Sequence, residues 1–289
     1  MSLALAVDVG GTKIEVGVVD DTGVILARAR TSATGVESAD ELVERLGELI
    51  DRFADSGAEV CGIGTGGPMT RGGVTVSPLN IRVWREFPLL SRVVERSGLE
   101  TFVENDAKAL ALAEGWKGAA RGESNFLAMV VSTGVGGGIV LDGRLLDGAE
   151  GNAGHIGHVV VEPEGTELPG HVRGVLESEV SGTAIRYRTG RPPAEADAVE
   201  IDRTGRLVGQ AVGSVANLLD LRLAVVAGSV ALGFGDPFFA AANAELERVA
   251  RLDHSRGARI IRAGLGADGP LVGAAAVAWR AVGVDIGVR

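Results

Sequence analysis

Two glycine-rich segments have the residue types that could bind a phosphate. Residues 10–13 read GGTK directly after the apolar run LALAVDV, and residues 133–137 read TGVGG after NFLAMVVS. Glycine turns expose backbone N–H groups that can converge on an anion. Asp8, just before the first segment, could hold a hydrated magnesium ion. Each segment alone could be a plain hairpin turn, but two turns of one design favour a triphosphate bound by both.

The surroundings of these segments exclude two common phosphate-binding motifs. Each glycine segment lies between two strand-like runs, IEVGVVD following the first and GIVLDG the second. A dinucleotide fingerprint and a Walker loop both require a helix after the glycines. The sequence therefore argues against a nicotinamide-dependent dehydrogenase.

A third candidate for chemistry is Asp106, which follows Asn105 between the strand-like run TFVE and the helix-like run AKALALAEGW. An aspartate at this point is commonly a helix N-cap. A phosphoryl-transfer enzyme, however, needs a carboxylate within hydrogen-bond reach of the attacking hydroxyl. A strand end facing a cleft is a suitable place for such a base.

Two of the four histidines, His155 and His158, lie three residues apart in the segment GHIGH. A zinc site would need about four ligands, and the other candidates are only the nearby His171 and the remote Cys61. Because imidazole can both donate and accept a hydrogen bond, recognition of sugar hydroxyls is the better interpretation.

The elements that must position these residues form a pattern used twice. The run LALAVDV-GGTK-IEVGVVDDTG resembles NFLAMVVST-GVGG-GIVLDGRLLDG, which predicts two similar lobes facing each other across a cleft. Ser38 and Glu41 have capping-box spacing, and the apolar residues that follow predict a helix over residues 38–56. After about Gly182 the chain is mostly helical, apart from the strand-like LAVVAG and the loop SVALGFG, and it ends in the helix GPLVGAAAVAWRAVG.

Composition excludes several classes of protein. The net charge of −10 and an aromatic content of 4% argue against nucleic-acid binding. The single cysteine excludes an intramolecular disulfide framework. No apolar run approaches the roughly 20 residues that span a bilayer, and the first residues lack a signal peptide's basic region. We expect a cytoplasmic protein with no membrane partner.

Together the segments DVGGTK, VSTGVGGGIV and GPLVGAAAVA resemble the ROK family (repressors, open reading frames and kinases) in their order and spacing. The resemblance implies an α/β, two-lobed, actin-like (hexokinase-like or ribonuclease H-like) fold, with duplicated mixed β-sheet lobes around a central cleft. The smaller lobe is expected over residues 1–107, completed by the C-terminal helix 272–289, and the larger lobe over residues 108–271. A homodimer is also implied.

The resemblance further implies an ATP-dependent kinase with magnesium carried by ATP. Asp106 matches the catalytic base. The implied sugar contacts are Gly67, Asn80, Asn105, Asp106, His155, His158 and Glu177. The implied ATP and phosphate contacts are Asp8, Gly10, Gly11, Thr12, Lys13, Thr133, Gly134, Gly136, Gly228 and Ser229.

This sequence departs from the family pattern at two places. Many members follow the GH motif with CxCGxxGC, which holds a structural zinc, but here Leu168, Gly170 and Val175 stand at the cysteine positions. We therefore expect no zinc, and we expect Leu168 and Val175 to hold the loop by apolar burial. The second departure is His155, where glucokinases of the family carry glutamate. The segment GHIGH resembles that of bacterial N-acetylmannosamine kinases.

These observations predict phosphorylation of the 6-hydroxyl of a hexose or N-acylhexosamine. N-acetylmannosamine is the expected substrate, glucose is the alternative, and the sequence leaves open whether polyphosphate can replace ATP. A catalytically silent sugar-binding protein is a further alternative, although Asp8, Lys13, Asp106 and Glu177 are all intact. A family repressor would carry an N-terminal helix-turn-helix, whereas this sequence begins in a strand at about Leu3.

Overall fold

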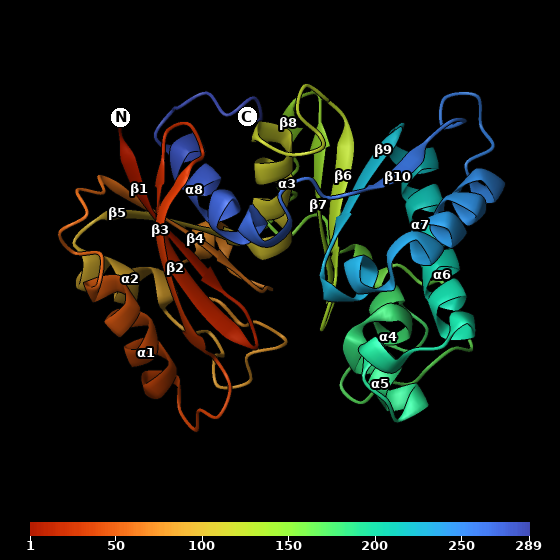
Figure 1. Ribbon diagram of the computed structural model, residues 1–289, viewed down its shortest axis with the longest axis horizontal. Coiled ribbons are helices and arrows are strands. Elements are labelled where there is room, and N and C mark those ends of the chain that lie inside the picture. The colour runs from red at the N-terminus through yellow and green to blue at the C-terminus, as the bar shows by residue number, and fades with distance from the viewer. The chain divides into compact units, whose positions relative to one another are not determined.

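A computed structural model describes all residues from Met1 to Arg289. The chain forms two compact units (Figure 1). Unit 1 consists of Met1–Arg121, Arg144–Ala153 and Leu265–Arg289, and unit 2 consists of Gly122–Gly143 and Gly154–Gly264. These bounds differ from the expected division between residues 107 and 108, because the helix that follows residue 105 packs within unit 1.

Unit 1 is built on a mixed five-stranded sheet in the order β3-β2-β1-β4-β5. The strands are β1 (Leu3–Val9), β2 (Lys13–Asp20), β3 (Ile25–Ser32), β4 (Val60–Thr65) and β5 (Glu100–Asn105). β1, β2 and β3 form an antiparallel meander, whereas β1, β4 and β5 are parallel. Parallel strands end at the same edge of a sheet, so the segments after β1, β4 and β5 come together there.

The two faces of this sheet carry residues of different size. Leu5, Val7 and Val9 of β1 join the core formed with α1 (Ala39–Asp51) and α2 (Leu89–Ser97). The alternate residues are small, and that face is covered by α8 (Gly269–Ala281), which also packs on α3 (Asp106–Trp116). A Cβ atom at Gly62 of β4 would lie 1.9 Å from the carbonyl oxygen of Ala274 in α8. The missing side chain allows α8 to lie directly on the sheet.

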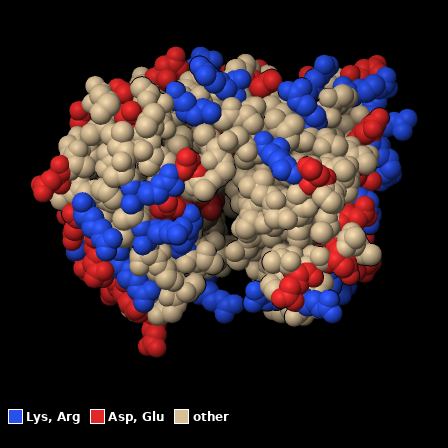
Figure 2. Space-filling model, in the orientation of Figure 1, with Lys and Arg blue, Asp and Glu red and all other residues tan.

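Ion pairs connect the exposed surfaces of α1 and α2. Arg92 of α2 pairs with Asp40, and Arg96 pairs with both Glu44 and Asp51 of α1. Figure 2 shows acidic and basic atoms side by side over these two helices, at its lower left. Exposed pairs of this kind contribute little to stability.

The second sheet has the same strand order as the first when it is read from β8 to β10. It consists of β6 (Phe126–Val131), β7 (Val135–Leu141), β8 (Arg144–Leu145), β9 (Leu223–Ala227) and β10 (Arg259–Arg262) in the order β10-β9-β6-β7-β8. β6 is antiparallel to β7 and parallel to β9, and β9 is parallel to β10. Since β6, β7 and β9 correspond in order and direction to β1, β2 and β4, the predicted duplication is confirmed.

The helices of unit 2 are α4 (Leu176–Val180), α5 (Gly182–Thr189), α6 (Ala198–Leu219) and α7 (Ser229–Val249). α6 and α7 pack against each other, α7 also contacts β10 and β6, and α4 packs on α6 and β7. A loop over residues 159–175 connects the GHIGH segment to α4 and is closed by an antiparallel bridge between Val160 and Val175. Among all the helices, none combines the length and the apolar character needed to cross a bilayer.

Candidate functional site

Asp8 and Asp106 lie close to each other at the edge where the parallel strands of unit 1 end. Asp8 pairs in register with Gly64 of β4, and Gly64 with Glu104 of β5, two residues before Asp106. A Cβ atom at Gly64 would lie 3.9 Å from Oδ1 of Asp8 and 3.8 Å from Cα of Asp106. Gly64 therefore separates the two aspartates without a side chain between them.

Asp8 is the most strongly perturbed carboxyl group of this cluster. Burial and, next, the charge of Asp106 raise the pKa of Asp8 from 3.8 to about 7. Lys13 acts in the opposite direction, and Glu15 adds to the rise. At neutral pH the site can therefore hold a proton on Asp8. Strong perturbation of this kind is typical of functional sites.

Lys13 forms an ion pair with Glu15, an acidic residue that the sequence analysis did not identify. Glu15, which is buried, faces Asp8 across the β1–β2 ladder. Its carboxylate accepts a hydrogen bond from Nζ of Lys13 at 2.7 Å and lies 3.6 Å from Nη1 of Arg28. The only sequence signal for Glu15 is its position two residues after Lys13, which places both on one face of a strand.

The glycine turn of unit 1 lies against two loops that carry predicted sugar contacts. The turn is closed by the N–H of Gly10, which donates to the carbonyl of Lys13 at 2.9 Å, and Thr12 accepts from Ala33. A Cβ atom at Gly11 would lie 2.9 Å from the carbonyl oxygen of Asn80. Gly67 accepts from the N–H of Leu79, the residue before Asn80. The structure thus brings Gly67 and Asn80 to the same turn as Gly11.

The helix N-cap at this edge is Asn105 and not Asp106. Oδ1 of Asn105 accepts hydrogen bonds from the N–H groups of Ala107 and Lys108, while Asp106 is the first residue of α3. The alternative in which Asp106 caps the helix is therefore wrong. Because Oδ1 of Asn105 is occupied, its amide donors are the groups that remain for a ligand. The N–H of Ala107 also donates to Oδ1 of Asp106 at 2.8 Å.

A buried lysine supports this helix. Lys108 is 1% exposed, and its Nζ lies 3.0 Å from Glu104 and 2.8 Å from Asp147. It also donates to the carbonyl of Gly151 at 3.0 Å. Lys108 therefore ties residues 147–151 to the helix that begins with Asp106, and no sequence motif indicated this.

In unit 2 the second glycine turn is joined to Glu177. The N–H of Val135 donates to Oε2 of Glu177 at 2.7 Å. A Cβ atom at Gly134 would lie 2.8 Å from the same oxygen, so a larger residue there would require the Glu177 carboxylate to shift. Thr133 accepts from the hydroxyl of Thr183 at 2.9 Å. Gly136, in β7, pairs with Val130 of β6.

Two further predicted segments lie at this turn. Ser229, at the start of α7, shares a 3.0 Å hydrogen bond with Ser132, the residue before the turn, and a Cβ atom at Gly228 would meet the carbonyl of Val131. The GHIGH segment lies against β7, since a Cβ atom at Gly157 would be 2.3 Å from the carbonyl of Val135. Gly228, Ser229, His155 and His158 therefore belong to the same unit as Glu177.

His155, His158 and the loop that follows them lack the converging side chains of a metal site. The rings of His155 and His158 are 6.0 Å apart, edge to face. No group of three or more His, Cys, Asp or Glu side chains is placed to hold a metal ion. Leu168 and Val175 are 4% and 1% exposed, which confirms the prediction that they are buried, whereas Gly170 is exposed.

A charged network that the sequence analysis missed also holds this loop. The fully buried carboxylate of Glu179, in α4, accepts hydrogen bonds from the N–H and the hydroxyl of Thr166 in the loop. It is paired with Arg203 of α6 and lies 3.9 Å from Arg188. Because a buried carboxylate needs such partners, this network fixes the loop to α4 at Thr166.

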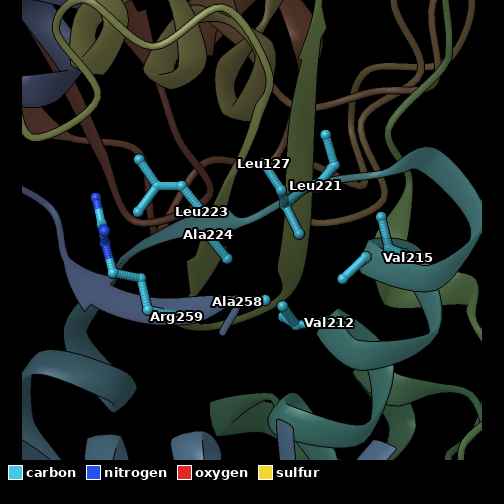
Figure 3. Close-up of a pocket in the computed structure, with 9 residues that line it drawn as sticks. Leu127, Val212, Val215, Leu221, Leu223, Ala224, Ala258 and Arg259 are labelled. Atoms are coloured by element: carbon cyan, nitrogen blue, oxygen red, sulfur yellow. The ribbon is translucent and has the colours of Figure 1, made fainter. Parts of the chain in front are cut away.

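The small cavity shown in Figure 3 contains none of the predicted site residues. It lies in unit 2 between β6, β9 and α6 and is lined by apolar side chains such as Leu127, Val212 and Leu223. Its volume of about 10 Å³ is that of about one water molecule. It is too small for a sugar or a nucleotide.

Comparison with known proteins places the chain in one family. Residues 4–281 match the ROK family. A glucokinase of Thermotoga maritima is 40% identical over 185 residues, which are 63% of this chain and 58% of that protein. An N-acetylmannosamine kinase of Yersinia pestis is 34% identical over 251 residues, covering 81% of this chain and 86% of that protein.

Solved structures give the same class. The ROK hexokinase of Thermus thermophilus superposes with a TM-score of 0.82 at 32% identity, over 97% of this chain and 99% of that one. A ROK family glucokinase from Streptomyces griseus, solved with glucose and AMPPNP, gives 0.84 at 28% identity, over 96% and 100%. The two sheets and their helices are thus those of the two-lobed, actin-like fold, which confirms the predicted fold class. The chain belongs to the ROK family.

Proposed function

We propose that this chain is an ATP-dependent sugar kinase that phosphorylates the 6-hydroxyl of a hexose or an N-acylhexosamine. The observation that carries the proposal is the pair of aspartates, Asp8 and Asp106, on either side of Gly64 at the edge where three parallel strands end. The names of the relatives support the same class, since they include glucokinase, N-acetylmannosamine kinase and hexokinase.

In the proposed reaction, Asp106 accepts the proton of the sugar 6-hydroxyl as that oxygen attacks the γ-phosphorus of MgATP. The new P–O bond forms while the bond to ADP breaks, and the products are the sugar 6-phosphate, ADP and a proton. The glycine turns at residues 10–13 and 133–136 supply backbone N–H groups for the phosphates. These groups and the magnesium of MgATP neutralise the charge that develops on the transferred group.

The sugar contacts are proposed from the same residues that the sequence indicated: Gly67, Asn80, Asn105, His155, His158 and Glu177. His155 and His158 can each donate and accept, which suits a ring with several hydroxyl groups. N-acetylmannosamine is the proposed substrate because GHIGH resembles the segment of kinases for that sugar. Glucose is the second candidate, supported by the glucokinase relatives.

The base assignment is tested by Asp106→Asn. General-base catalysis typically contributes about 10²- to 10⁴-fold, so we expect kcat to fall by roughly that factor while the sugar KM changes only a few-fold. Asp55→Asn, at an exposed position of unit 1, is the matched control. A near-normal kcat for Asp106→Asn would show that the assignment is wrong.

The substrate is identified by following ADP release with MgATP against N-acetylmannosamine, N-acetylglucosamine, glucose, mannose, fructose and no sugar. Preference for N-acetylmannosamine would support the role of His155, and preference for glucose would support the second candidate. Turnover with none of them, together with sugar-dependent thermal stabilisation, would favour the silent sugar-binding protein. The same sugars are also tested with polyphosphate in place of ATP as the phosphoryl donor. Light scattering tests the homodimer that the family resemblance implies.

A further inference from the structure

Both oxygens of the Glu177 carboxylate have a fixed partner within unit 2. Oε2 accepts the 2.7 Å hydrogen bond from the N–H of Val135, and Oε1 lies 3.1 Å from Nδ1 of His171. The side chain of Glu177 is 11% exposed and that of His171 is 22% exposed. A carboxylate held at both oxygens has its plane defined before any ligand arrives.

The imidazole of His171 is itself held in place. The N–H of His171 donates to the carbonyl of the buried Leu168 at 2.9 Å, and the next carbonyl, that of Val172, accepts from the hydroxyl of Ser178 in α4. The loop is anchored a second time through Glu179. His171 therefore belongs to an anchored part of the loop, and its side chain is partly buried.

The chemistry of this 3.1 Å contact between Nδ1 and Oε1 determines where a proton must lie. A carboxylate oxygen accepts, so Nδ1 of His171 must carry a proton, which is true of one neutral tautomer and of the imidazolium. Each carboxylate oxygen has two lone pairs. The N–H of Val135 uses one lone pair of Oε2, and His171 lies at ion-pair distance from Oε1. Each oxygen therefore keeps a lone pair for a hydroxyl donor.

From this geometry we propose that His171 is a positioning residue, which orients the Glu177 carboxylate to accept hydrogen bonds from the sugar. The proposal rests on the proposed function, in which Glu177 contacts the sugar. His171 does not touch the sugar or ATP in this scheme, and it acts only through Glu177. Removing a partner that orients a metal-binding side chain commonly costs about 10- to 100-fold in affinity or activity, and we expect an effect of similar kind for a sugar-binding carboxylate.

The test compares His171→Ala with His171→Asn, in which the side-chain amide nitrogen can occupy the place of Nδ1. We expect His171→Ala to raise the sugar KM about tenfold while the ATP KM changes less than about twofold, and we expect His171→Asn to restore most of the loss. His254→Ala is the matched control, because Nε2 of His254 bonds the backbone oxygen of Asn217 and not a proposed site residue.

A double-mutant cycle separates positioning from a general structural role. If His171 acts through Glu177, His171→Ala should add little to the sugar KM of Glu177→Gln. An unchanged sugar KM for His171→Ala in an otherwise active enzyme would refute the positioning role alone. The positioning role would also be refuted if His171→Ala lowered kcat and raised the sugar KM and the ATP KM by similar factors, and if His171→Asn restored none of them. A wild-type protein that neither turns over nor binds any sugar would instead refute the proposed function, and the positioning role with it.

Discussion

Replacing Asp8 by asparagine should make the stability of unit 1 less dependent on pH. Asparagine has nearly the shape of a protonated aspartate but cannot ionise. Burial and the charge of Asp106 raise the pKa of Asp8 to about 7 in the folded protein, whereas the unfolded chain has the ordinary value of 3.8. Between these two values the folded state holds a proton that the unfolded state has lost.

The sign and size of the effect follow from this difference. Where the folded state binds more protons, the free energy of unfolding falls as pH rises, by up to about 1.4 kcal/mol per pH unit. The contribution is fully present below pH 3.8 and is lost as the pH rises to and through 7. Asp8→Asn should therefore match the wild type near pH 4 and be more stable by on the order of 2–4 kcal/mol at pH 8.

The assay is urea unfolding between pH 5 and 8, followed by tryptophan fluorescence. All three tryptophans, at positions 84, 116 and 279, lie in unit 1, so the signal reports the unit that contains Asp8. In an Asp106→Asn background the benefit of Asp8→Asn should shrink, because the charge that raises the pKa of Asp8 is gone. A stability difference between Asp8→Asn and wild type that is the same at pH 5 and pH 8 would refute the reasoning.

Three further predictions concern stability and thiol reactivity. Gly62→Ala should lower the free energy of unfolding by about 1–3 kcal/mol, since its methyl group would lie 1.9 Å from the backbone oxygen of Ala274. Calorimetry should show the opposite sign for Gly233→Ala, which has open space on helix α7 and should gain about 0.5–1 kcal/mol. Burial raises the pKa of the Cys61 thiol to about 12, so its reaction with a thiol reagent should be at least ~100-fold slower in the folded protein than in urea. Rapid labelling under native conditions would contradict this.

Local sequence patterns predicted the elements that depend on local contacts. The capping-box spacing of Ser38 and Glu41 placed the start of α1, and the hydroxyl of Ser38 does accept from the N–H of Glu41. The other half of the box differs, because Glu41 binds the N–H of Glu37 instead. The two strand–glycine–strand runs were found for the same reason, since a hairpin joins neighbours in sequence.

The features that sequence analysis missed depend on partners far along the chain. Glu179 pairs with Arg203, and Lys108 pairs with Asp147, at separations that have no regular period. The N-cap of α3 was ambiguous for a different reason. Asparagine and aspartate have about equal N-cap preference, so nothing local distinguishes Asn105 from Asp106 in that role. Only the fold shows that Asn105 caps the helix and leaves Asp106 inside its first turn.

The order of segments in unit 1 has a consequence for how the chain folds as it is synthesised. Helix α8 covers one face of the first sheet, yet it follows all of unit 2 in the sequence. Until residues 269–281 leave the ribosome, the small residues of β1 and β4 beneath α8 lack their cover. Unit 2 has all its residues by position 264. The second half of the chain can therefore mature first, and the sheet that carries Asp8 is the last part to close.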